Sequence, residues 1–559
     1  MRCCPISATI LLLCYCPFLA AQQPGRAEPR VVFNDDAQVL MESPHQGAGD
    51  FVRAWLDREV EAVPFSTFVF LAATPDICTY ETRAGEVYGD RFGDDFDEGL
   101  ARGIRSLREE GTDALAVVTE HMHSHGKEVL AAIRMSDTHH SRITAENPLC
   151  PLFAVEHPEF VIRQPDGRTN ETALDYSYPE VRSHRLAIMK EIVEDYDVDG
   201  LELNFVRWAK HFPRDQGRDK APVLTRFMAD LYKIMQDAAR QRGKESLTLG
   251  IRVPESLAAC WLAGVDVQTW VKHGWIDYLV ISTWNNTDPQ LRVSEFSQFT
   301  RPAGVDTIVV MGNMMGCIDV NPPLILDRPV AMSAKHGKNY QGMLLTAREA
   351  RGAAANYYTF GADSISFWNV GIHFGSEVTA GPEQQQRIAQ WTSAVATRED
   401  VFSGPRTYRY LPMGKGISTR KPPVRNYPWY DENRSPLGHQ NNPILRFGVG
   451  VNGDRQIFPF LMADGRDGRT IEGKMTFWIY HLDPTDELMV SINGRRVPPR
   501  KVRRLPTGDR RGGLPGQRVE IALGDCPPFA GENQLGLMIS LPAGSERVPY
   551  MEELEVQVD

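Results

Sequence analysis

Residues 200–206 place chemically active side chains on one face of a short apolar segment. Side chains of a strand alternate between its two faces, so Leu201 and Leu203 share one face while Glu202 and Asn204 share the other. The leucines would pack under surrounding helices, and Glu202 would point into an interior where a carboxyl group can transfer a proton or bind a hydroxyl group. The alternative is an ion-paired glutamate with only a structural role, although buried carboxylates are rare unless they are paired or functional.

Carboxylates, arginines, amides and tryptophans lie at the C-terminal ends of six of the segments that the sequence predicts as strands. The set comprises Arg134, Asp137, Glu202, Asn204, Arg207, Arg252, Glu255, Trp284, Asn285, Asn313, Trp368 and Asn369. Parallel strands of a closed barrel end at one rim, where barrel enzymes build their active sites, so we expect these side chains to lie together. Each residue alone could instead cap a strand or form a turn.

Three carboxylates in this set provide the groups that glycoside hydrolysis requires. The reaction needs two carboxyl groups on either side of the scissile bond, one of which donates a proton. Burial beside Trp284 or Trp368 would raise the pKa of a carboxylic acid, as a proton donor requires. We predict Glu255 as the acid, and either Glu202 or Asp137 as the nucleophile or as the base that activates water.

The other residues of the set are predicted to bind a carbohydrate substrate. Arginines would hold the carboxylates or an anionic sugar group, tryptophans would form a stacking floor, and asparagines would bond to sugar hydroxyl groups. The arginines are Arg134, Arg207 and Arg252, and the tryptophans are Trp284 and Trp368. The asparagines are Asn204, Asn285, Asn313 and Asn369. No cofactor is expected for this chemistry.

A histidine triplet offers a different interpretation, a metal site. His121, His123 and His125 alternate along the sequence, but alternate residues of a helix point about 200° apart. Only His121 and His125 could therefore share a face. A solvent-exposed helix end is the preferred interpretation of this triplet.

Two further motifs are weighed and set aside. Asp137 with His139 and His140 could bind a divalent metal ion for a deacetylase-like reaction, but no further His/Asp cluster at metal spacing completes the site. Residues 448–453 match GxGxxG literally, but no helix is predicted after them, so a nucleotide-binding fingerprint is not expected. We predict no metal ion in the active site.

Positioning these side chains requires strands that alternate with helices. Strand-like segments occur at residues 65–72, 129–135, 200–206, 247–253, 276–283, 307–312 and 364–368, and an eighth could lie in the region 76–92. Helical spacing marks residues 112–125, 343–360 and a segment that begins at Pro222 and ends before Gly243. Seven or eight strand–helix units over about 330 residues favour an α/β fold, the (β/α)8 TIM barrel. A doubly wound sheet is the competing fold.

The pattern changes after residue 399. Residues 403–442 are rich in Pro, Gly, Arg and Tyr, and short alternating segments follow at 474–480, 487–492, 518–523, 534–540 and 554–558. Such segments between turns are typical of an all-β sandwich. We therefore predict the barrel over residues 30–400, a linker or wrapping arm over 401–450 and a β-sandwich accessory domain over 451–559.

Length, charge and the N-terminus limit the function classes. A chain of 559 residues is too long for one hydrophobic core, and a net charge of −11 argues against nucleic acid or an anionic membrane surface as a partner. An apolar stretch from Ile6 to Ala20 predicts a signal peptide over residues 1–21. We expect a secreted or periplasmic protein with no membrane insertion after signal removal.

Four of the nine cysteines precede residue 21, and the others form no CxxC pair, which excludes a zinc ribbon.

Four segments resemble a known group of proteins. They are HGKEV at 125–129, RMSDTH at 134–139, YDVDGLELNFVR at 196–207 and GADSISFWN at 361–369. These segments resemble the secreted bacterial glycosyl-hydrolase-like barrels described as family-ten-like, and the resemblance spans about residues 65–396. It implies a TIM barrel that acts on or binds a polysaccharide. Segments 486–494 and 529–535 resemble the jelly-roll accessory domains of many glycosidases.

One position departs from that family. The resemblance implies an aspartate where this chain has Asn204, and an asparagine is neither a carboxylic proton donor nor a carboxylate nucleophile. We expect an exported glycosidase that uses Glu255, Glu202 and Asp137. The alternatives are a non-catalytic carbohydrate-binding protein on a degenerate barrel and a metal-dependent hydrolase such as a deacetylase.

Overall fold

The computed structural model describes most of the chain. The described residues are 29–140, 142–163, 172–283, 287–319, 329–331, 340–370, 382–411, 445–446, 454–465, 471–508 and 513–559. Two predicted sugar-binding residues, Trp284 and Asn285, lie outside them, as do the predicted signal peptide and the GxGxxG segment 448–453.

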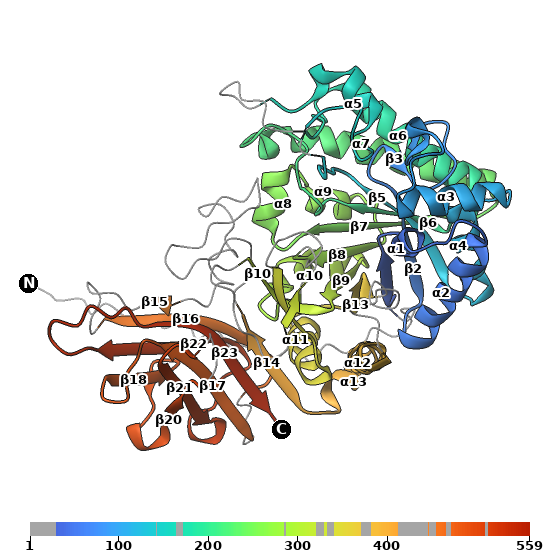
Figure 1. The fold of residues 1–559 in the computed structure, drawn as a ribbon. Helices are drawn as coiled ribbons and strands as arrows, with labels where there is room; N and C mark the ends of the chain where they lie inside the picture. The colour runs from blue at the N-terminus through green and yellow to red at the C-terminus, as the bar shows by residue number, and fades with distance from the viewer. Residues whose placement is uncertain are drawn as a thin grey trace, which may run out of the picture.

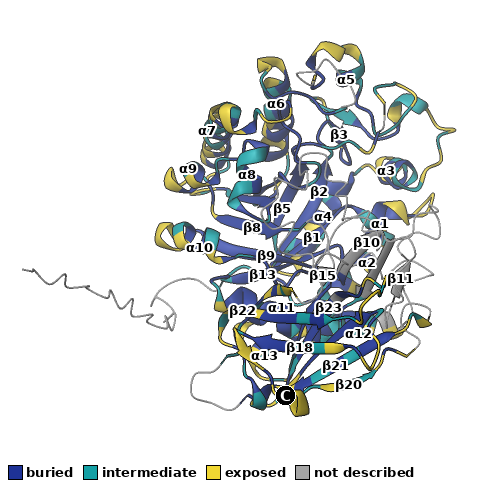
Figure 2. Ribbon diagram, turned by 90° about the vertical axis from the view of Figure 1, so that its left-hand side faces the viewer, coloured by how far each residue is buried: buried dark blue, intermediate teal, exposed yellow. Residues whose placement is uncertain are grey.

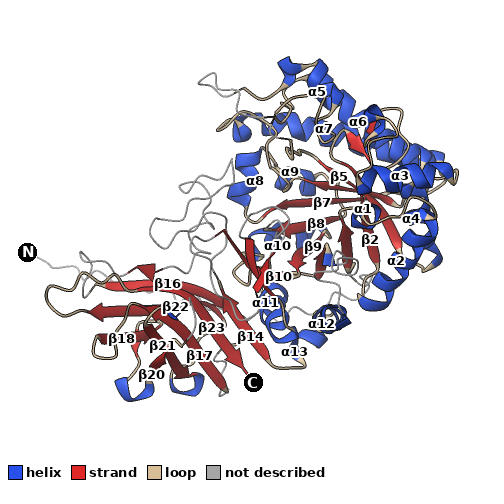
Figure 3. Ribbon diagram, viewed as in Figure 1, coloured by secondary structure: helices blue, strands red, loops and turns tan. Residues whose placement is uncertain are grey.

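Eight parallel strands form a closed barrel (Figure 1 and Figure 3). In chain order they are β1 (Val32–Asp35), β2 (Thr67–Ala73), β5 (Glu128–Arg134), β6 (Gly200–Asn204), β7 (Thr248–Pro254), β8 (Tyr278–Ser282), β9 (Asp306–Gly312) and β13 (Ser364–Trp368). Successive strands are hydrogen-bonded, and β1 pairs with both β2 and β13, which closes the barrel. The predicted (β/α)8 fold is confirmed.

All seven strands that the sequence predicts are present, but the predicted place of the eighth was wrong. The region 76–92 contributes only the two-residue strands β3 (Ile77–Cys78) and β4 (Glu86–Val87), at the side of β2. The eighth barrel strand is β1, which precedes the predicted series. Its four residues are too few for a clear alternating pattern, so its signal in the sequence is weak.

Helices surround the barrel, with exposed residues on their outer faces and buried residues toward the strands (Figure 2). They are α1 (Gln38–Met41), α2 (Ala48–Ala62), α3 (Gly99–Glu109), α4 (Ala114–Ser124), α5 (Leu152–Glu156), α6 (Pro179–Asp195), α7 (Gly217–Gln241), α8 (Leu257–Ala263), α9 (Val267–Lys272), α10 (Ser294–Thr300), α11 (Ala347–Thr359), α12 (Pro382–Ser393) and α13 (Arg398–Phe402). Two boundaries differ from the predictions. Helix α7 begins before Pro222, and residues 343–344 belong to β12 (Tyr340–Leu344), which pairs with β10 (Met314–Asp319) and β11 (Pro329–Ala331).

Alternation along β6 divides its side chains between the helices and the barrel interior. Leu201 and Leu203 belong to the hydrophobic core. Glu202 contacts side chains of β1 and β8, which are not neighbours of β6, so it faces the interior. Both faces of the strand are covered, and all of its residues are buried.

Two antiparallel sheets form the C-terminal part of the chain, which confirms the predicted all-β fold there. One contains β14 (Arg406–Tyr410), β15 (Leu445–Arg446), β17 (Gly473–Tyr480), β20 (Arg503–Pro506), β21 (Gly516–Ala522) and β23 (Tyr550–Val558). The other contains β16 (Arg455–Met462), β18 (Glu487–Ile492), β19 (Arg495–Arg496) and β22 (Gly531–Ser540). Strand β14 lies within residues 401–450 and pairs with β23, the last strand.

A buried ion cluster joins the barrel to these sheets. Arg409 of β14 donates to Glu553 of β23 at 2.7 Å and to Glu349 of α11 at 3.1 Å. Figure 1 shows β14 beside α11. The arginine therefore holds a barrel helix against the last strand.

Four cysteines have described side chains, and none of the four forms a disulfide. Cys78, Cys150, Cys260 and Cys526 are buried free thiols. In the described part of the chain, no helix combines the length and apolar character needed to cross a lipid bilayer.

Candidate active site

Glu202 lies in the barrel interior, two residues before the carboxyl end of β6. Its carboxylate accepts hydrogen bonds from Asn34 Nδ2 on β1 at 2.9 Å and from the Tyr278 hydroxyl on β8 at 2.8 Å, and the residue is 1% exposed. Burial raises the pKa of the Glu202 carboxyl above its ordinary value, and these hydrogen bonds and the charge of Arg252 offset the rise only in part. Glu202 therefore holds a proton more readily than an ordinary glutamate.

Gly250 makes room for the tyrosine that reaches this carboxylate. Gly250 lies on β7, between the strands of Glu202 and Tyr278. A Cβ atom at position 250 would lie 2.0 Å from Tyr278 Cζ and 2.3 Å from its hydroxyl oxygen. These distances are far shorter than van der Waals contact, so a side chain at position 250 would displace the ring and its hydrogen bond. The site depends on a glycine here because the ring packs directly against the backbone.

Arg252 and Trp368 form a second interior contact. Arg252 is 1% exposed and donates from Nη2 to Ser282 Oγ at 2.8 Å. Its Cζ lies 5.1 Å from the centroid of the Trp368 ring, a cation–π distance. The indole N–H of Trp368 is buried, and no partner for it is found among the described residues. It is a donor that a ligand or a water molecule can satisfy.

An ion cluster lies at the carboxyl ends of β1 and β5. Arg134, the last residue of β5, places Nη2 2.9 Å from Asp36 Oδ2 and Nη1 2.7 Å from Asp137 Oδ2. None of the three side chains is more than 7% exposed. One guanidinium group thus holds two carboxylates side by side.

The pKa values of these carboxyl groups move in the opposite direction from that of Glu202. Burial alone would raise the pKa of Asp137, but the hydrogen bond from His139 and the charges of Arg134 and Arg207 bring it below the ordinary value. Asp36 is likewise buried, and the charges of Arg134 and Arg207 lower its pKa. Glu202 lies close enough to Asp36 for that charge to raise the pKa of Glu202 further, while the pKa values of Asp36 and Asp137 are lowered; carboxyl groups with pKa values pushed apart are the pattern of an acid–base pair.

Residues 207 and 208 extend the cluster toward solvent. Arg207 Nη2 lies 2.9 Å from His139 Nε2, and His139 Nδ1 lies 2.6 Å from Asp137 Oδ1. A guanidinium group only donates, so Nε2 accepts and the ring proton on Nδ1 is donated to Asp137. Trp208 is partly buried, with Arg207 4.5 Å above its ring and the His139 ring edge-on at 4.4 Å. Its φ of 47° is rare for a bulky residue, and such strain clusters at functional sites.

Two asparagines of the predicted set position the ends of strands. Asn204 Oδ1 accepts from the backbone N–H groups of Val206 at 2.9 Å and Arg207 at 3.1 Å, which orders the turn after β6. Asn369 donates to Asp36 Oδ2 at 2.8 Å and accepts from the Asp36 backbone N–H at 2.9 Å. Both amides lie at the rim, but these bonds are made within the protein.

Asn313 and Glu255 have other surroundings. Asn313 Oδ1 accepts from Trp391 Nε1 of α12 at 3.2 Å. Glu255 follows β7 directly, and its charge adds to burial in raising the pKa of the Cys260 thiol on α8. The structure thus gathers Glu202, Arg252 and Trp368 in the interior, with Arg134, Asp137, Asn204, Arg207 and Asn369 around the rim.

The alternative metal site of Asp137, His139 and His140 is not formed in the described part of the chain. His139 contacts Asp137, but His140 Nε2 faces the backbone carbonyl of Thr172 at 3.3 Å. Burial lowers the pKa of His140. The three side chains therefore do not share a common centre.

Sequence reasoning missed five residues of the site. They are Asn34, Asp36, Trp208, Tyr278 and Ser282. The first two belong to the unpredicted strand β1 and its carboxyl end, where apolar residues 31–33 followed by polar residues 34–36 were the available signal. Tyr278 and Ser282 lay inside a predicted strand, but only the register of the barrel shows that they face Glu202 and Arg252.

The family model described as Glycosyl hydrolase-like 10 matches residues 92–220. The matched segment contains β5, β6 and the rim residues from Arg134 to Trp208. The family resemblance that the sequence predicts is confirmed for this segment.

Several solved glycoside hydrolase structures align with the chain at low identity. Alpha-L-fucosidase isoenzyme 2 from Paenibacillus thiaminolyticus is 13% identical with a TM-score of 0.40, over 68% of this chain and 51% of that chain. The PgaB (BpsB) glycoside hydrolase domain from Bordetella bronchiseptica is 11% identical with a TM-score of 0.37, over 66% of this chain and 99% of that chain. The Ostrinia furnacalis Group IV chitinase is 11% identical with a TM-score of 0.39, over 66% and 100%. The chain thus spans about half the length of the fucosidase. No curated protein matches the sequence.

Proposed function

We propose that the protein is an exported glycoside hydrolase that binds a polysaccharide or oligosaccharide at the carboxyl end of the barrel and cleaves a glycosidic bond there. The observation that supports this proposal is the opposite direction of two pKa shifts. The pKa of Glu202 is raised by burial, while that of Asp137 is lowered by His139 and the arginines despite burial. Glycoside hydrolysis needs a protonated and an ionised carboxyl group under the same conditions.

Glu202 takes the role of the general acid in this proposal, and Asp137 that of the nucleophile or base. Glu202 thus replaces Glu255, which the sequence predicts as the acid. Asp137 is preferred to Asp36 because its contact with His139, and through it with Arg207, extends toward solvent, whereas Asp36 is bonded to Asn369 inside the barrel end. Arg134 keeps Asp137 ionised until it acts.

The two tryptophans supply surfaces for a sugar ring. Trp208 is partly buried at the rim, where a pyranose can stack on its face. Trp368 lies deeper, and its indole N–H can donate to a sugar hydroxyl group. A neutral glycan suits this site because its hydroxyl groups both donate and accept hydrogen bonds.

A non-catalytic carbohydrate-binding protein is the second candidate, and Asn204 favours it. The resemblance implies an aspartate at this position, while the asparagine here accepts two backbone hydrogen bonds. Both oxygens of Asp137 are also engaged, by His139 and Arg134. A barrel that kept its sugar contacts and lost one carboxylate would bind a glycan without cleaving it.

The test measures binding and cleavage in the same samples. The protein is mixed with a panel of polysaccharides, and calorimetry reports binding while a reducing-end assay reports cleavage. New reducing ends support the hydrolase. Binding to a polysaccharide without new reducing ends supports the second candidate, and the absence of both contradicts both proposals.

The variant Asn204→Asp sharpens this test. An aspartate keeps the oxygen that accepts from Val206 and Arg207, so the turn after β6 is preserved. Cleavage by this variant but not by the wild type would identify position 204 as the place where activity was lost. Asn313→Asp is the matched control, since Asn313 also follows a barrel strand but bonds to Trp391.

Export is proposed from the apolar N-terminal segment of the sequence. Mass spectrometry of the protein recovered from the medium or the periplasm would give its first residue. A start near residue 22 is expected, whereas a chain retained in the cytosol with Met1 would contradict export.

A further inference from the structure

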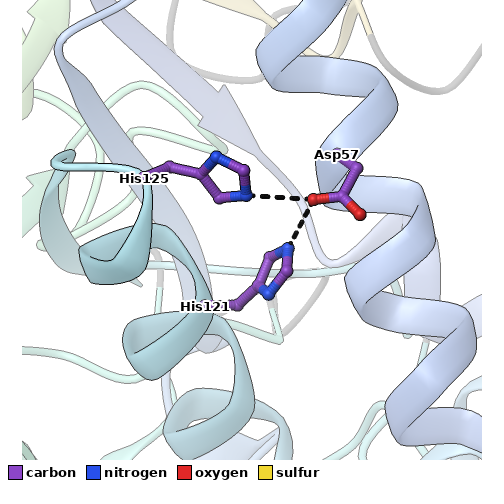
Figure 4. A group of neighbouring side chains, drawn as sticks. All are labelled: Asp57, His121 and His125. Carbon is purple, nitrogen blue, oxygen red and sulfur yellow. Dashed lines mark hydrogen bonds and ion pairs between the residues drawn. The ribbon is translucent and has the colours of Figure 1, made fainter.

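Three metal-ligand side chains meet on the outside of the barrel, between α2 and α4. Asp57 lies on α2, His121 in the last turn of α4, and His125 directly after that helix. Asp57 Oδ1 is 2.8 Å from His121 Nε2 and 3.0 Å from His125 Nε2 (Figure 4). One donor atom from each residue lies within 4.8 Å of the other two.

We propose that Asp57, His121 and His125 bind a divalent transition-metal ion of the zinc class, with water completing the coordination. Zinc binds imidazole nitrogen and carboxylate oxygen at about 2.0–2.2 Å and prefers four tetrahedral ligands, which then lie about 3.3 Å apart. Asp57 Oδ1 is slightly closer than that to each of the two Nε2 atoms. The Asp57 side chain is 49% exposed, so its carboxylate has room to withdraw by the few tenths of an ångström that an ion requires.

The arrangement of the two histidines supports an ion more than a simple hydrogen bond. Residues four apart lie on the same face of a helix, and helical zinc sites use this histidine spacing. The two rings are 4.9 Å apart at 67°, and both Nε2 atoms point at one oxygen. His123 provides the contrast, because it contacts other carboxylates, Asp199 at 2.8 Å and Asp197 at 3.9 Å.

The chemistry of the donor set predicts which ions bind. Two imidazoles and one carboxylate favour zinc, copper, nickel or cobalt. Magnesium and calcium prefer oxygen ligands in larger numbers. We therefore expect zinc to bind and magnesium to have no measurable effect.

The place of the site in the fold indicates a structural role. Helix α2 leads into β2 and α4 leads into β5, so the trio lies toward the amino-terminal ends of the strands. In barrels of this type, that end contributes stability and the opposite end contains the active site. An ion there would join α2 to α4, and this inference does not depend on the proposed hydrolase activity.

The test uses the whole protein, purified without a histidine tag and stripped of metal with a chelator. Calorimetry with zinc chloride should give one ion per chain, and zinc but not magnesium should raise the Tm. Asp57→Asn and His125→Gln should each weaken zinc binding at least tenfold. His123→Gln is the matched control, because it removes a histidine of the same helix turn and should change zinc affinity by less than about twofold.

Each of the following results would overturn the proposed zinc site. Absence of zinc binding by the wild type overturns the proposal, and so does binding that Asp57→Asn and His125→Gln leave unchanged, because other side chains would then hold the ion. Cobalt provides a readout that needs no variant. Cobalt bound to the wild type should show the visible absorption of a four-coordinate site, and a spectrum of hydrated cobalt alone would overturn the proposal.

Discussion

The two ends of the barrel carry charged groups in different surroundings, although the same eight strands form both ends. At the carboxyl end, Arg134 and its two aspartates are at most 7% exposed. At the amino end, Glu128 pairs with Arg30, and these side chains are 23% and 31% exposed. The ion cluster around Arg134 at the carboxyl end is thus removed from water, while the Arg30–Glu128 pair at the amino end remains partly solvated.

Under the proposed function, this difference separates the residues that bind or react with the glycan from the residues that support the fold. A partly exposed ion pair contributes about 0–1 kcal/mol. A buried ion cluster loses so much hydration that replacing it with apolar residues often stabilises a protein. The cluster around Arg134 is therefore weak evidence for a role in stability, and its place at the rim agrees with the proposed role in binding or catalysis.

The largest expected effect is on turnover. Glu202→Gln keeps the shape of the side chain but removes the proton donor, and a general acid contributes about 10²–10⁴-fold to the rate. We expect kcat to fall at least about 10²-fold on any glycan that the wild type cleaves. Glu128→Gln at the amino end is the control and should leave kcat unchanged. Equal rates for Glu202→Gln and the wild type would end the assignment of Glu202 as the acid.

The next effect is on stability. Arg134→Met leaves Asp36 and Asp137 buried without their shared partner, and breaking a buried ion pair costs about 3–5 kcal/mol. Arg30→Met at the amino end should cost less than Arg134→Met, because its pair with Glu128 is partly exposed. Urea unfolding of both variants measures the free energies. Similar losses of unfolding free energy in Arg134→Met and Arg30→Met would mean that burial does not distinguish the ion pairs at the two ends of the barrel.

A pH dependence follows from Asp35, which ends β1. Burial and then the charge of Asp36 raise the pKa of Asp35 to about 7. The folded chain holds this proton at pH values where the unfolded chain has lost it, so Asp35 contributes stability at low pH that is lost as the pH rises through 7. In the wild type, this loss should lower the free energy of unfolding by about 3 kcal/mol between pH 5 and pH 8, and Asp35→Asn should remove that decline.

The control for this prediction is Asp197→Asn near the amino end, where the side chain is 75% exposed. Unfolding free energies measured across the pH range should show the same slope for this control and the wild type. An unchanged slope in Asp35→Asn would show that another group causes the decline.

The smallest expected effect is on glycan affinity. Trp208→Ala removes the partly buried ring at the rim, and an aromatic contact is worth about 0.5–1.5 kcal/mol. Affinity should therefore fall by about threefold to tenfold in calorimetry. Trp275→Ala, which removes an aromatic ring stacked on His273 before β8, should leave affinity unchanged. A loss of affinity only in Trp275→Ala would place the glycan elsewhere.

Local pattern was enough to predict most of the barrel. Apolar alternation over residues 200–206 predicted Glu202 and Asn204 on the inner face of β6; in the structure Glu202 faces the interior, and Asn204 lies at the rim and orders the turn after the strand. Strand β1 was missed because four residues carry too little periodicity, and Asn34 and Asp36 were missed with it. The histidine spacing 121/125 indicated a shared helix face, but nothing local pointed to Asp57, which lies far earlier in the chain.

The sequence by itself determined which residues are apolar, which strands alternate and which side of a strand carries the polar groups, because these depend on neighbours within a few positions. Only the tertiary structure decided that Asn34 and Tyr278 bond to Glu202 and that Arg134 holds Asp36 beside Asp137. The directions of the pKa shifts were decided there too, since burial and the distances to charges exist only after the barrel closes and sets its register.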